Sequence, residues 1–138
     1  VAVLATSGTL GGPRFARLVE RFADGVSVHT VACPDLVRLV EAGQTQGPEA
    51  EAAVRRYVAP LVAEGVDTLV LGCTHFPPLR PLIAAAAPGA TIVDTGPAVA
   101  AQTARLAEAG GLRTGAGGLR CATTGDPGAV APALARVW

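Results

Sequence analysis

Lysine and methionine are both absent from the 138 residues, and all eleven basic residues are arginines. Without lysine, the chain can neither form a Schiff base with pyridoxal phosphate nor supply the lysine of a P-loop. It opens directly on the strand-like run VAVLA, with no initiator methionine. We therefore expect a fragment or a trimmed chain, with removal of the methionine from a natural start as the alternative.

Cysteine is scarce and charge is balanced. Cys33, Cys73 and Cys121 are odd in number and far apart in the sequence, which argues against a disulfide framework. We expect reduced thiols and a cytoplasmic protein. The formal net charge is zero at pH 7, which argues against a general binder of nucleic acid or of membrane surfaces. Charged residues, glycine or proline interrupt every apolar run before it reaches the length of a membrane span.

Half of the residues are hydrophobic, and strand-like segments alternate with helix-like ones. The expected strands are 1–5, 26–32, 67–72, 91–96 and 119–125. The expected helices are 14–23, 35–43, 47–65, 78–87, 97–109 and a last one from Asp126, with Pro60 expected to kink or split the third. Such alternation predicts βαβ units, a parallel sheet and the α/β class. Sheets of this class bind ligands at the carboxyl ends of their strands.

A thiol, a hydroxyl and an imidazole stand together where the third expected strand ends. Cys73, Thr74 and His75 directly precede a proline-rich segment that is typical of the first turn of a helix. Free N–H groups at a helix start favour anions and can lower a thiol pKa below its usual value of about 8.5. The three residues therefore suit carboxylate binding and thiol chemistry. A cysteine after a strand is also commonly a packing residue, so spacing alone leaves both interpretations open.

The first expected strand ends in a hydroxyl-rich turn. Thr6, Ser7 and Thr9 lie in a glycine-rich loop before a helix, where they could cradle a carboxylate or a phosphate. The loop is not the GxGxxG fingerprint of dinucleotide-binding proteins. A hydroxyl-rich N-cap turn explains the same letters equally well.

The remaining candidates have plainer explanations. We expect Cys33, before Pro34, and Cys121, inside the last strand, to be packing residues. Glu41 is typical of a solvated carboxylate near a helix end, and His29 of a structural residue in a strand. A zinc site that combines Cys33 and Cys73 with a histidine has no supporting CxxC or HxxxH spacing, so we expect no metal.

The stretch LVLGCTHFPPLRPLI resembles the second catalytic motif of the glutamate racemase family, within the aspartate/glutamate racemase superfamily. The agreement continues in order along nearly the whole chain. VAVLATSGTL resembles that family's strand with a Thr-x-x-Thr loop, and ACPDLVRLVEAG resembles its Ala-Cys-Pro helix that ends in a glutamate. IVDTGPAVA and ATTGDPGAV resemble its later strand ends.

The resemblance implies a cofactor-independent interconversion of L- and D-glutamate that supplies D-glutamate for peptidoglycan synthesis. In that family, one cysteine thiolate removes the α-proton and a second thiol delivers a proton to the opposite face. The absence of lysine agrees, because the main alternative racemase chemistry uses a pyridoxal-binding lysine. The family's roles transfer to matching positions: the second catalytic cysteine is Cys73, substrate contacts are Thr74, His75, Thr6 and Thr9, and His75 and the assisting glutamate Glu41 support catalysis.

One departure concerns the family's first cysteine, which stands in an Asn-Thr-containing strand end that this sequence does not contain. By the family's pattern, residues 1–93 form an intact α/β lobe with the Cys-Thr-His motif. Residues 94–138 are expected to be the C-terminal part of the other, incomplete lobe. We expect glutamate as the small-molecule substrate, no nucleic-acid or membrane partner, and a homodimer when the protein is intact. The alternatives are an aspartate or hydantoin racemase of the same superfamily, or a non-catalytic lobe that binds an acidic ligand.

Overall fold

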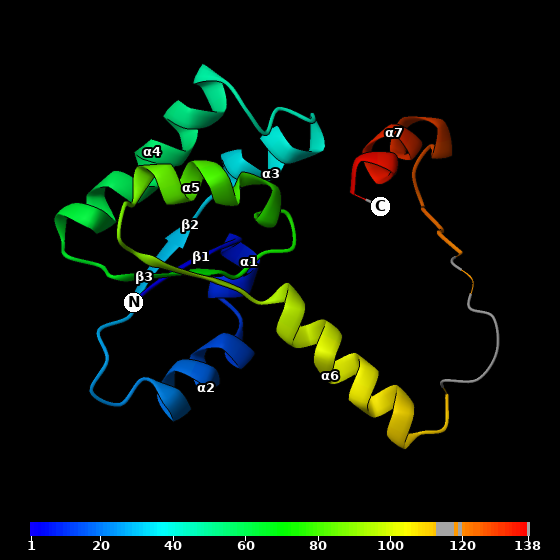
Figure 1. Ribbon diagram of the computed structural model, residues 1–138, viewed down its shortest axis with the longest axis horizontal. Coiled ribbons are helices and arrows are strands. Elements are labelled where there is room, and N and C mark those ends of the chain that lie inside the picture. The colour runs from blue at the N-terminus through cyan, green and yellow to red at the C-terminus, as the bar shows by residue number, and fades with distance from the viewer. Residues whose placement is uncertain (113–117, 119, 138) are drawn as a thin grey trace. The chain divides into compact units, whose positions relative to one another are not determined.

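The computed structural model describes residues 1–112, 118 and 120–137 (Figure 1). The chain divides into two compact units, Val1–Thr95 and Gly96–Trp138. The elements follow in the order β1 (Ala2–Ala5), α1 (Ser7–Leu10), α2 (Pro13–Phe22), β2 (His29–Ala32), α3 (Pro34–Glu41), α4 (Pro48–Ala63), β3 (Thr68–Leu71), the 3-10 turn η1 (Pro77–Leu79), α5 (Arg80–Ala86), β4 (Thr91–Asp94), α6 (Gly96–Ala109) and α7 (Pro127–Val137).

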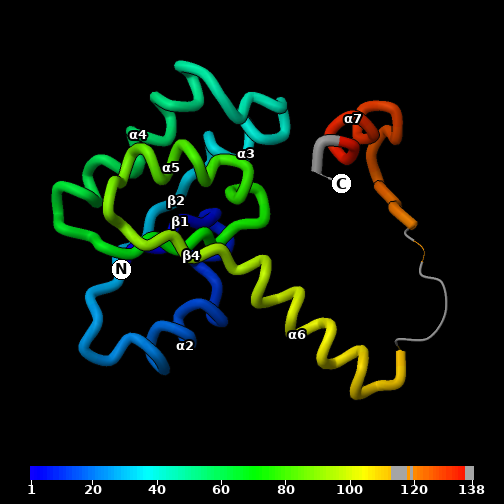
Figure 2. Tube along the Cα trace, in the orientation of Figure 1, coloured from blue at the N-terminus to red at the C-terminus, as the bar shows by residue number. Residues whose placement is uncertain are grey.

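The first unit is built on a four-stranded sheet in the order β2-β1-β3-β4, and every neighbouring pair is parallel. The predicted α/β class and parallel sheet are confirmed. From β1 the chain moves to β2 on one side, and it then returns to β3 and β4 on the other side. Because crossovers in parallel sheets are right-handed, such a reversal places helices on both faces. Helix α2 lies on one side of the sheet and α4 and α5 lie on the other (Figures 1 and 2).

The core lies between the sheet and helices α3, α4 and α5. Alternate strand residues point into it, as the two-residue period of a strand requires: Leu4, Leu69 and Leu71 are almost completely buried. The helices meet them with apolar side chains that recur at helical spacing, among them Leu36, Leu39, Val54, Val58, Leu79 and Ile83. Each fully buried side chain of this kind contributes about 1.5–3 kcal/mol relative to exposure. This face is therefore the one that stabilises the unit.

The opposite face of the sheet is covered only in part. An apolar groove of about 550 Å³ lies there, with Val3 and Val70 of the sheet and Phe15 of α2 among its lining residues. Two further lining residues on α2, Leu18 and Phe22, keep 55% and 66% of their surface exposed. Parallel sheets normally bury both faces, so this groove is an incompletely covered part of the unit.

Two sequence-based expectations are wrong for the described residues. Residues 120–125 form no strand, and Cys121, expected in a strand core, is exposed. A strand needs the backbone groups of a neighbouring strand, and in the described part of Gly96–Trp138 there is no strand to pair with. The remaining expected strand position, residue 119, lies outside the described residues.

The expected break at Pro60 does not split its helix, because α4 continues to Ala63. Pro60 lies in the last turn, so the hydrogen bond that its missing N–H would make to the carbonyl four residues earlier is lost only near the end of the helix. The expected start of the last helix is confirmed: Asp126 Oδ1 accepts a hydrogen bond from the Gly128 N–H at 2.9 Å. Within the described residues, no helix has the length and the apolar character needed to cross a membrane.

Candidate active site

The polar residues that follow β1 and β3 lie at the point where the strand order reverses. β1 and β3 are neighbours in the centre of the sheet, and the Gly72 N–H donates to the Leu4 carbonyl at 2.8 Å. A Cβ atom on Gly72 would lie 3.1 Å from that same carbonyl oxygen, so a glycine lets the two strand ends approach closely. Thr6 and Cys73 are therefore carried by adjacent strands at the edge where such sheets bind ligands.

Cys73, His75 and Glu41 form a contiguous series of polar contacts. The Cys73 thiol lies 3.7 Å from His75 Nδ1, and Glu41 Oε1 lies 3.3 Å from His75 Nε2. Cys73 is half-buried, whereas the His75 and Glu41 side chains are 36% and 63% exposed. A carboxylate on one imidazole nitrogen and a thiol on the other is an arrangement that can move a proton to and from sulfur.

Different elements supply the members of this series. Cys73 and His75 lie on the loop after β3, while Glu41 is the last residue of α3, more than thirty residues earlier in the chain. Helix α3 ends there because Gly43 adopts a positive φ of 73° and its N–H donates to the Val40 carbonyl at 2.9 Å. The fold thus brings to His75 a carboxylate that the sequence pattern alone identifies as a solvated one.

The helix start beside Cys73 is weaker than the sequence indicates. The loop leads into the three-residue turn η1, in which Pro77 and Pro78 have no N–H group, and only then into α5. Fewer backbone donors are therefore available to an anion at this point than at an ordinary helix start. The imidazole of His75 is the neighbouring group that can assist the Cys73 thiol.

The hydroxyl groups of the first loop serve as a helix cap. Thr6 is the N-cap of α1, and its Oγ1 lies 3.0 Å from Thr9 Oγ1 and accepts from the Thr9 N–H at 3.3 Å. Thr9 is exposed, as is Thr74 beside Cys73. These hydroxyl groups remain accessible to a ligand while they organise the loop.

Cys33 is a packing residue, as expected. It is fully buried, and its thiol donates to the Val31 carbonyl at 3.4 Å. Burial, followed by the negative charges that Cys73 and Asp35 can carry, raises the pKa of Cys33 to about 12. This thiol therefore stays protonated at neutral pH. His29 is half-exposed and pairs with Glu64 at 3.0 Å, which suits its expected structural role.

Among the described residues, no group of three or more His, Cys, Asp and Glu side chains could hold a metal ion. The zinc site of Cys33, Cys73 and His75, which was weighed from the sequence and not expected, has no geometric counterpart in this part of the chain.

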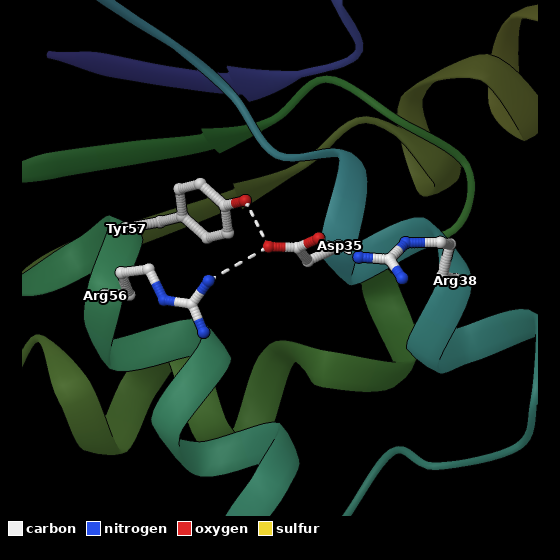
Figure 3. A network of polar contacts seen from close by, with 4 residues as sticks. All are labelled: Asp35, Arg38, Arg56 and Tyr57. Atoms are coloured by element: carbon white, nitrogen blue, oxygen red, sulfur yellow. Dashed lines mark hydrogen bonds and ion pairs between the residues drawn. The ribbon is translucent and has the colours of Figure 1, made fainter.

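One polar cluster is not apparent from the sequence. Asp35, in the first turn of α3, accepts hydrogen bonds from Tyr57 and Arg56 of α4 and pairs with Arg38 of its own helix (Figure 3). The hydrogen bonds from Arg38 and Tyr57 hold the pKa of Asp35 below its usual range. Burial, followed by the neighbouring Asp35, raises the pKa of Tyr57. The i, i+3 spacing of Asp35 and Arg38 could predict their pairing from the sequence. Nothing in the sequence indicates that Asp35 also bonds to residues of α4.

Comparison with known proteins identifies the family of the chain. The family model of Asp/Glu/Hydantoin racemase matches residues 1–103. A glutamate racemase of Herpetosiphon aurantiacus is 51% identical over 131 residues, which are 92% of this chain and 52% of that protein. A glutamate racemase of Pseudomonas putida is 48% identical over 141 residues, covering 100% of this chain and 53% of the relative.

Solved structures show the same similarity. The crystal structure of glutamate racemase from Thermus thermophilus in complex with β-chloro-D-alanine superposes with a TM-score of 0.81 at 32% identity, over 99% of this chain and 51% of that one. Escherichia coli glutamate racemase in complex with L-glutamate and the activator UDP-MurNAc-Ala gives a TM-score of 0.73 at 30% identity, over 99% of this chain and 54% of that one. The chain spans about half the length of the curated relatives it matches. By the family model, the sequence identities and the shared fold, the chain belongs to the Asp/Glu/Hydantoin racemase family.

Proposed function

We propose that this chain provides one of the two proton-transferring sides of a glutamate racemase, with Cys73 as its thiol. The observation that carries the proposal is the series Cys73–His75–Glu41, with contacts of 3.7 and 3.3 Å, at the carboxyl ends of the central strands. The identities of 48–51% to proteins named glutamate racemase support glutamate as the substrate.

In the proposed reaction, the Cys73 thiolate takes the α-proton from one face of glutamate. The electron pair of the broken C–H bond remains on the substrate as a carbanion that is delocalised into its own α-carboxylate. A second thiol then donates a proton to the opposite face, and the reverse reaction exchanges the two roles. Since the substrate itself accommodates the electron pair, the mechanism requires no cofactor and no metal.

His75 and Glu41 prepare the thiol for this step. An imidazole that accepts the thiol proton generates the thiolate, and the Glu41 carboxylate on its other nitrogen stabilises the resulting imidazolium. The accessible hydroxyl groups of Thr74, Thr6 and Thr9 are proposed to donate hydrogen bonds to the substrate carboxylates. Such donors would hold the α-carbon in line with Cys73.

The second thiol is proposed to come from outside the residues of this chain. Cys33 is buried and protonated, with a pKa of about 12, which makes it unsuitable as a base. The relatives are about twice as long as the matched region, so they contain further residues that could provide this thiol. By the same family relationship we propose a cytoplasmic homodimer that supplies D-glutamate to peptidoglycan synthesis, without nucleic-acid or membrane partners. Residues 1–93 would act as one lobe of the enzyme and residues 94–138 as part of the other.

The test is α-proton exchange in deuterated water, in a polypeptide that joins this chain to a segment with the second thiol. We expect racemisation of glutamate, and its loss by at least about a thousandfold in Cys73→Ala, because one face of the α-carbon then lacks its proton carrier. Cys121→Ser is the matched control, since it removes an exposed thiol outside the proposed site. Near-normal rates in Cys73→Ala would contradict the two-thiol mechanism.

The same assay separates the alternatives. Faster exchange with aspartate or with a hydantoin than with glutamate would identify another activity of the family. Binding of glutamate without any exchange would indicate a non-catalytic lobe that only binds an acidic ligand.

A further inference from the structure

Helix α3 connects two polar clusters that lie at its opposite ends. Asp35 is in its first turn and Glu41 is its last residue, so the two are separated by six residues, or about 9 Å of helix. Glu41 contacts His75, whereas Asp35 contacts α4. The helix is eight residues long, and its N-cap residue, Cys33, makes no capping hydrogen bond through its side chain.

Apolar packing holds α3 against the core but leaves its rotation less defined. Leu36 and Leu39 are its buried side chains. Burial of apolar surface is non-directional, so it stabilises contact more than it selects one rotation about the helix axis. Hydrogen bonds are directional and weaken steeply away from linear geometry. A network of hydrogen bonds between α3 and α4 can therefore fix the rotation of α3 about its axis, which apolar packing alone does not define.

The Asp35 cluster, defined as Asp35, Arg56 and Tyr57, is such a network (Figure 3). Asp35 Oδ2 accepts from the Tyr57 hydroxyl at 3.0 Å and from Arg56 Nη1 at 3.1 Å. The two donors are adjacent on α4, a helix of sixteen residues anchored by buried Val54 and Val58. The carboxylate on the short helix is thus tied to the longer and better anchored one.

We propose that the Asp35 cluster is a positioning device, which fixes α3 against α4 so that Glu41 reaches His75 and thereby sets the reactivity of the Cys73 thiol. The proposal rests on the function proposed above in one respect, namely that Cys73 reactivity matters for turnover. Asp35, Arg56 and Tyr57 act through Glu41 and do not contact the thiol or the substrate. They are positioning residues, and none of them belongs to the Cys73–His75–Glu41 series.

Glu41, His75 and Cys33 are the ionisable groups that can influence the reactivity of the Cys73 thiol. Glu41 and His75 form the series itself, and the nearby Cys33 thiol stays protonated with a pKa of about 12. Loss of the Glu41 contact removes the negative charge that stabilises a protonated His75, and with it part of the support for a Cys73 thiolate. A misplaced Glu41 should therefore slow the reaction of Cys73 with an alkylating reagent at neutral pH.

The experiment measures the rate of Cys73 alkylation by iodoacetamide between pH 6 and 9 in the complete 138-residue chain, with peptide mapping to separate Cys73 from Cys121. We expect Tyr57→Phe to lower the alkylation rate of Cys73 about two- to fivefold at pH 7, as a coupling of about 0.5–1 kcal/mol implies. Glu41→Gln should lower the rate as well. Tyr57→Phe keeps the ring and removes only the hydroxyl. Asp35→Asn should act in the same direction.

The decisive comparison is the double variant Tyr57→Phe/Glu41→Gln. If the cluster acts through Glu41, the double variant reacts no more slowly than Glu41→Gln alone. Glu64→Gln is the matched control, because it removes the charge of the C-cap residue of α4, which pairs with His29, without touching α3, and it should leave the Cys73 profile unchanged.

Additive slowing in the double variant, an unchanged rate in Tyr57→Phe, or equal slowing in Glu64→Gln would each overturn the positioning role. Thermal unfolding of every variant identifies any loss of the folded state, and Tyr57→Phe, the mildest change, provides the result if Asp35→Asn unfolds. The experiment measures thiol reactivity and not turnover. It can therefore support or overturn the positioning role even if the racemase assay fails.

Discussion

Cys33 and Cys73 illustrate how far one residue type can differ within a single fold. Each follows a strand and precedes a segment that contains proline, so their sequence contexts are similar. Cys33 is fully buried with its thiol bonded to a backbone carbonyl, whereas Cys73 is half-buried beside an imidazole. Surroundings that the fold supplies, and not the cysteine itself, decide which thiol is suited to chemistry.

The raised pKa of Cys33 predicts a loss of stability at alkaline pH. Its pKa is raised to about 12 in the folded chain, so between pH 9 and pH 12 the folded chain holds a proton that the unfolded chain has released. The contribution of the protonated Cys33 thiol to the free energy of unfolding is fully present below pH 9 and is lost as the pH rises towards 12. The free energy of unfolding should fall by about 1.4 kcal/mol per pH unit across this window.

Urea unfolding at pH 7, 9 and 10.5 measures this slope, with Cys33→Ala as the comparison. The variant is expected to be less stable at pH 7, because it leaves a cavity in the core, but its stability should depend less on pH above 9. Tyr57, whose pKa is raised mainly by burial and by Asp35, titrates in both proteins, so most of its contribution is common to the two slopes. Equal slopes in the two proteins would exclude Cys33 as the source.

At the scale of the elements, the contact between β1 and β3 predicts that Gly72 cannot be replaced freely. An added Cβ would lie 3.1 Å from the Leu4 carbonyl oxygen, 3.2 Å from Val3 Cγ1 and 3.3 Å from Ala5 Cβ. Both strands are central in the sheet and have little room to move. We expect Gly72→Ala to reduce the free energy of unfolding by about 1–3 kcal/mol, as overpacking does.

Urea unfolding provides the measurement, and Gly8→Ala is the matched control. Gly8 lies in α1 with no atom within 4 Å of an added Cβ, so alanine there should be neutral or slightly stabilising. Gly72→Ala should also slow Cys73 alkylation, because the displaced strand end carries the thiol. A stable Gly72→Ala with unchanged Cys73 reactivity would contradict the close packing of the two strands.

The elements of Val1–Thr95 could largely be predicted from the sequence, because their apolar periodicity and their glycine and proline boundaries agree with the fold. The short helix α1 is less apparent, since one turn capped by Thr6 has the same letters as a loop. The expected strand at 119–125 shows the opposite case, in which local propensity has no neighbouring strand to satisfy it. Element prediction therefore succeeds where local pattern and tertiary partners agree.

The site divides in the same way. Cys73, Thr74 and His75 are contiguous in sequence, so their proximity does not depend on the fold. The Glu41 contact with His75, and the bonds from Tyr57 and Arg56 to Asp35, join residues on different elements. No periodicity in the sequence specifies which exposed side chains of α3 and α4 will meet, so this part required the structure.

At the scale of the whole molecule, we predict that the 138-residue chain alone does not racemise glutamate. Two-sided proton transfer needs a thiol on each face of the α-carbon. Cys73 is suited to one face, and Cys33 is buried and protonated. Cys121 is exposed and lies in the other compact unit, in a segment without helix or strand. One correctly placed thiol supports at most proton exchange on a single face, without net inversion.

Polarimetry on L- and D-glutamate detects inversion, and proton NMR in deuterated water detects α-proton exchange, both on the purified 138-residue chain. The expected result is no inversion, with restoration when a segment that carries the second thiol is supplied by fusion or co-expression. Cys73→Ala in the restored protein is the control that ties activity to this chain. Full inversion by the chain alone would contradict the prediction, and its dependence on protein concentration would then be decisive. A rate that rises with the square of the concentration would mean that two copies each contribute Cys73 to one site, whereas a linear rate would require a second base within the single chain.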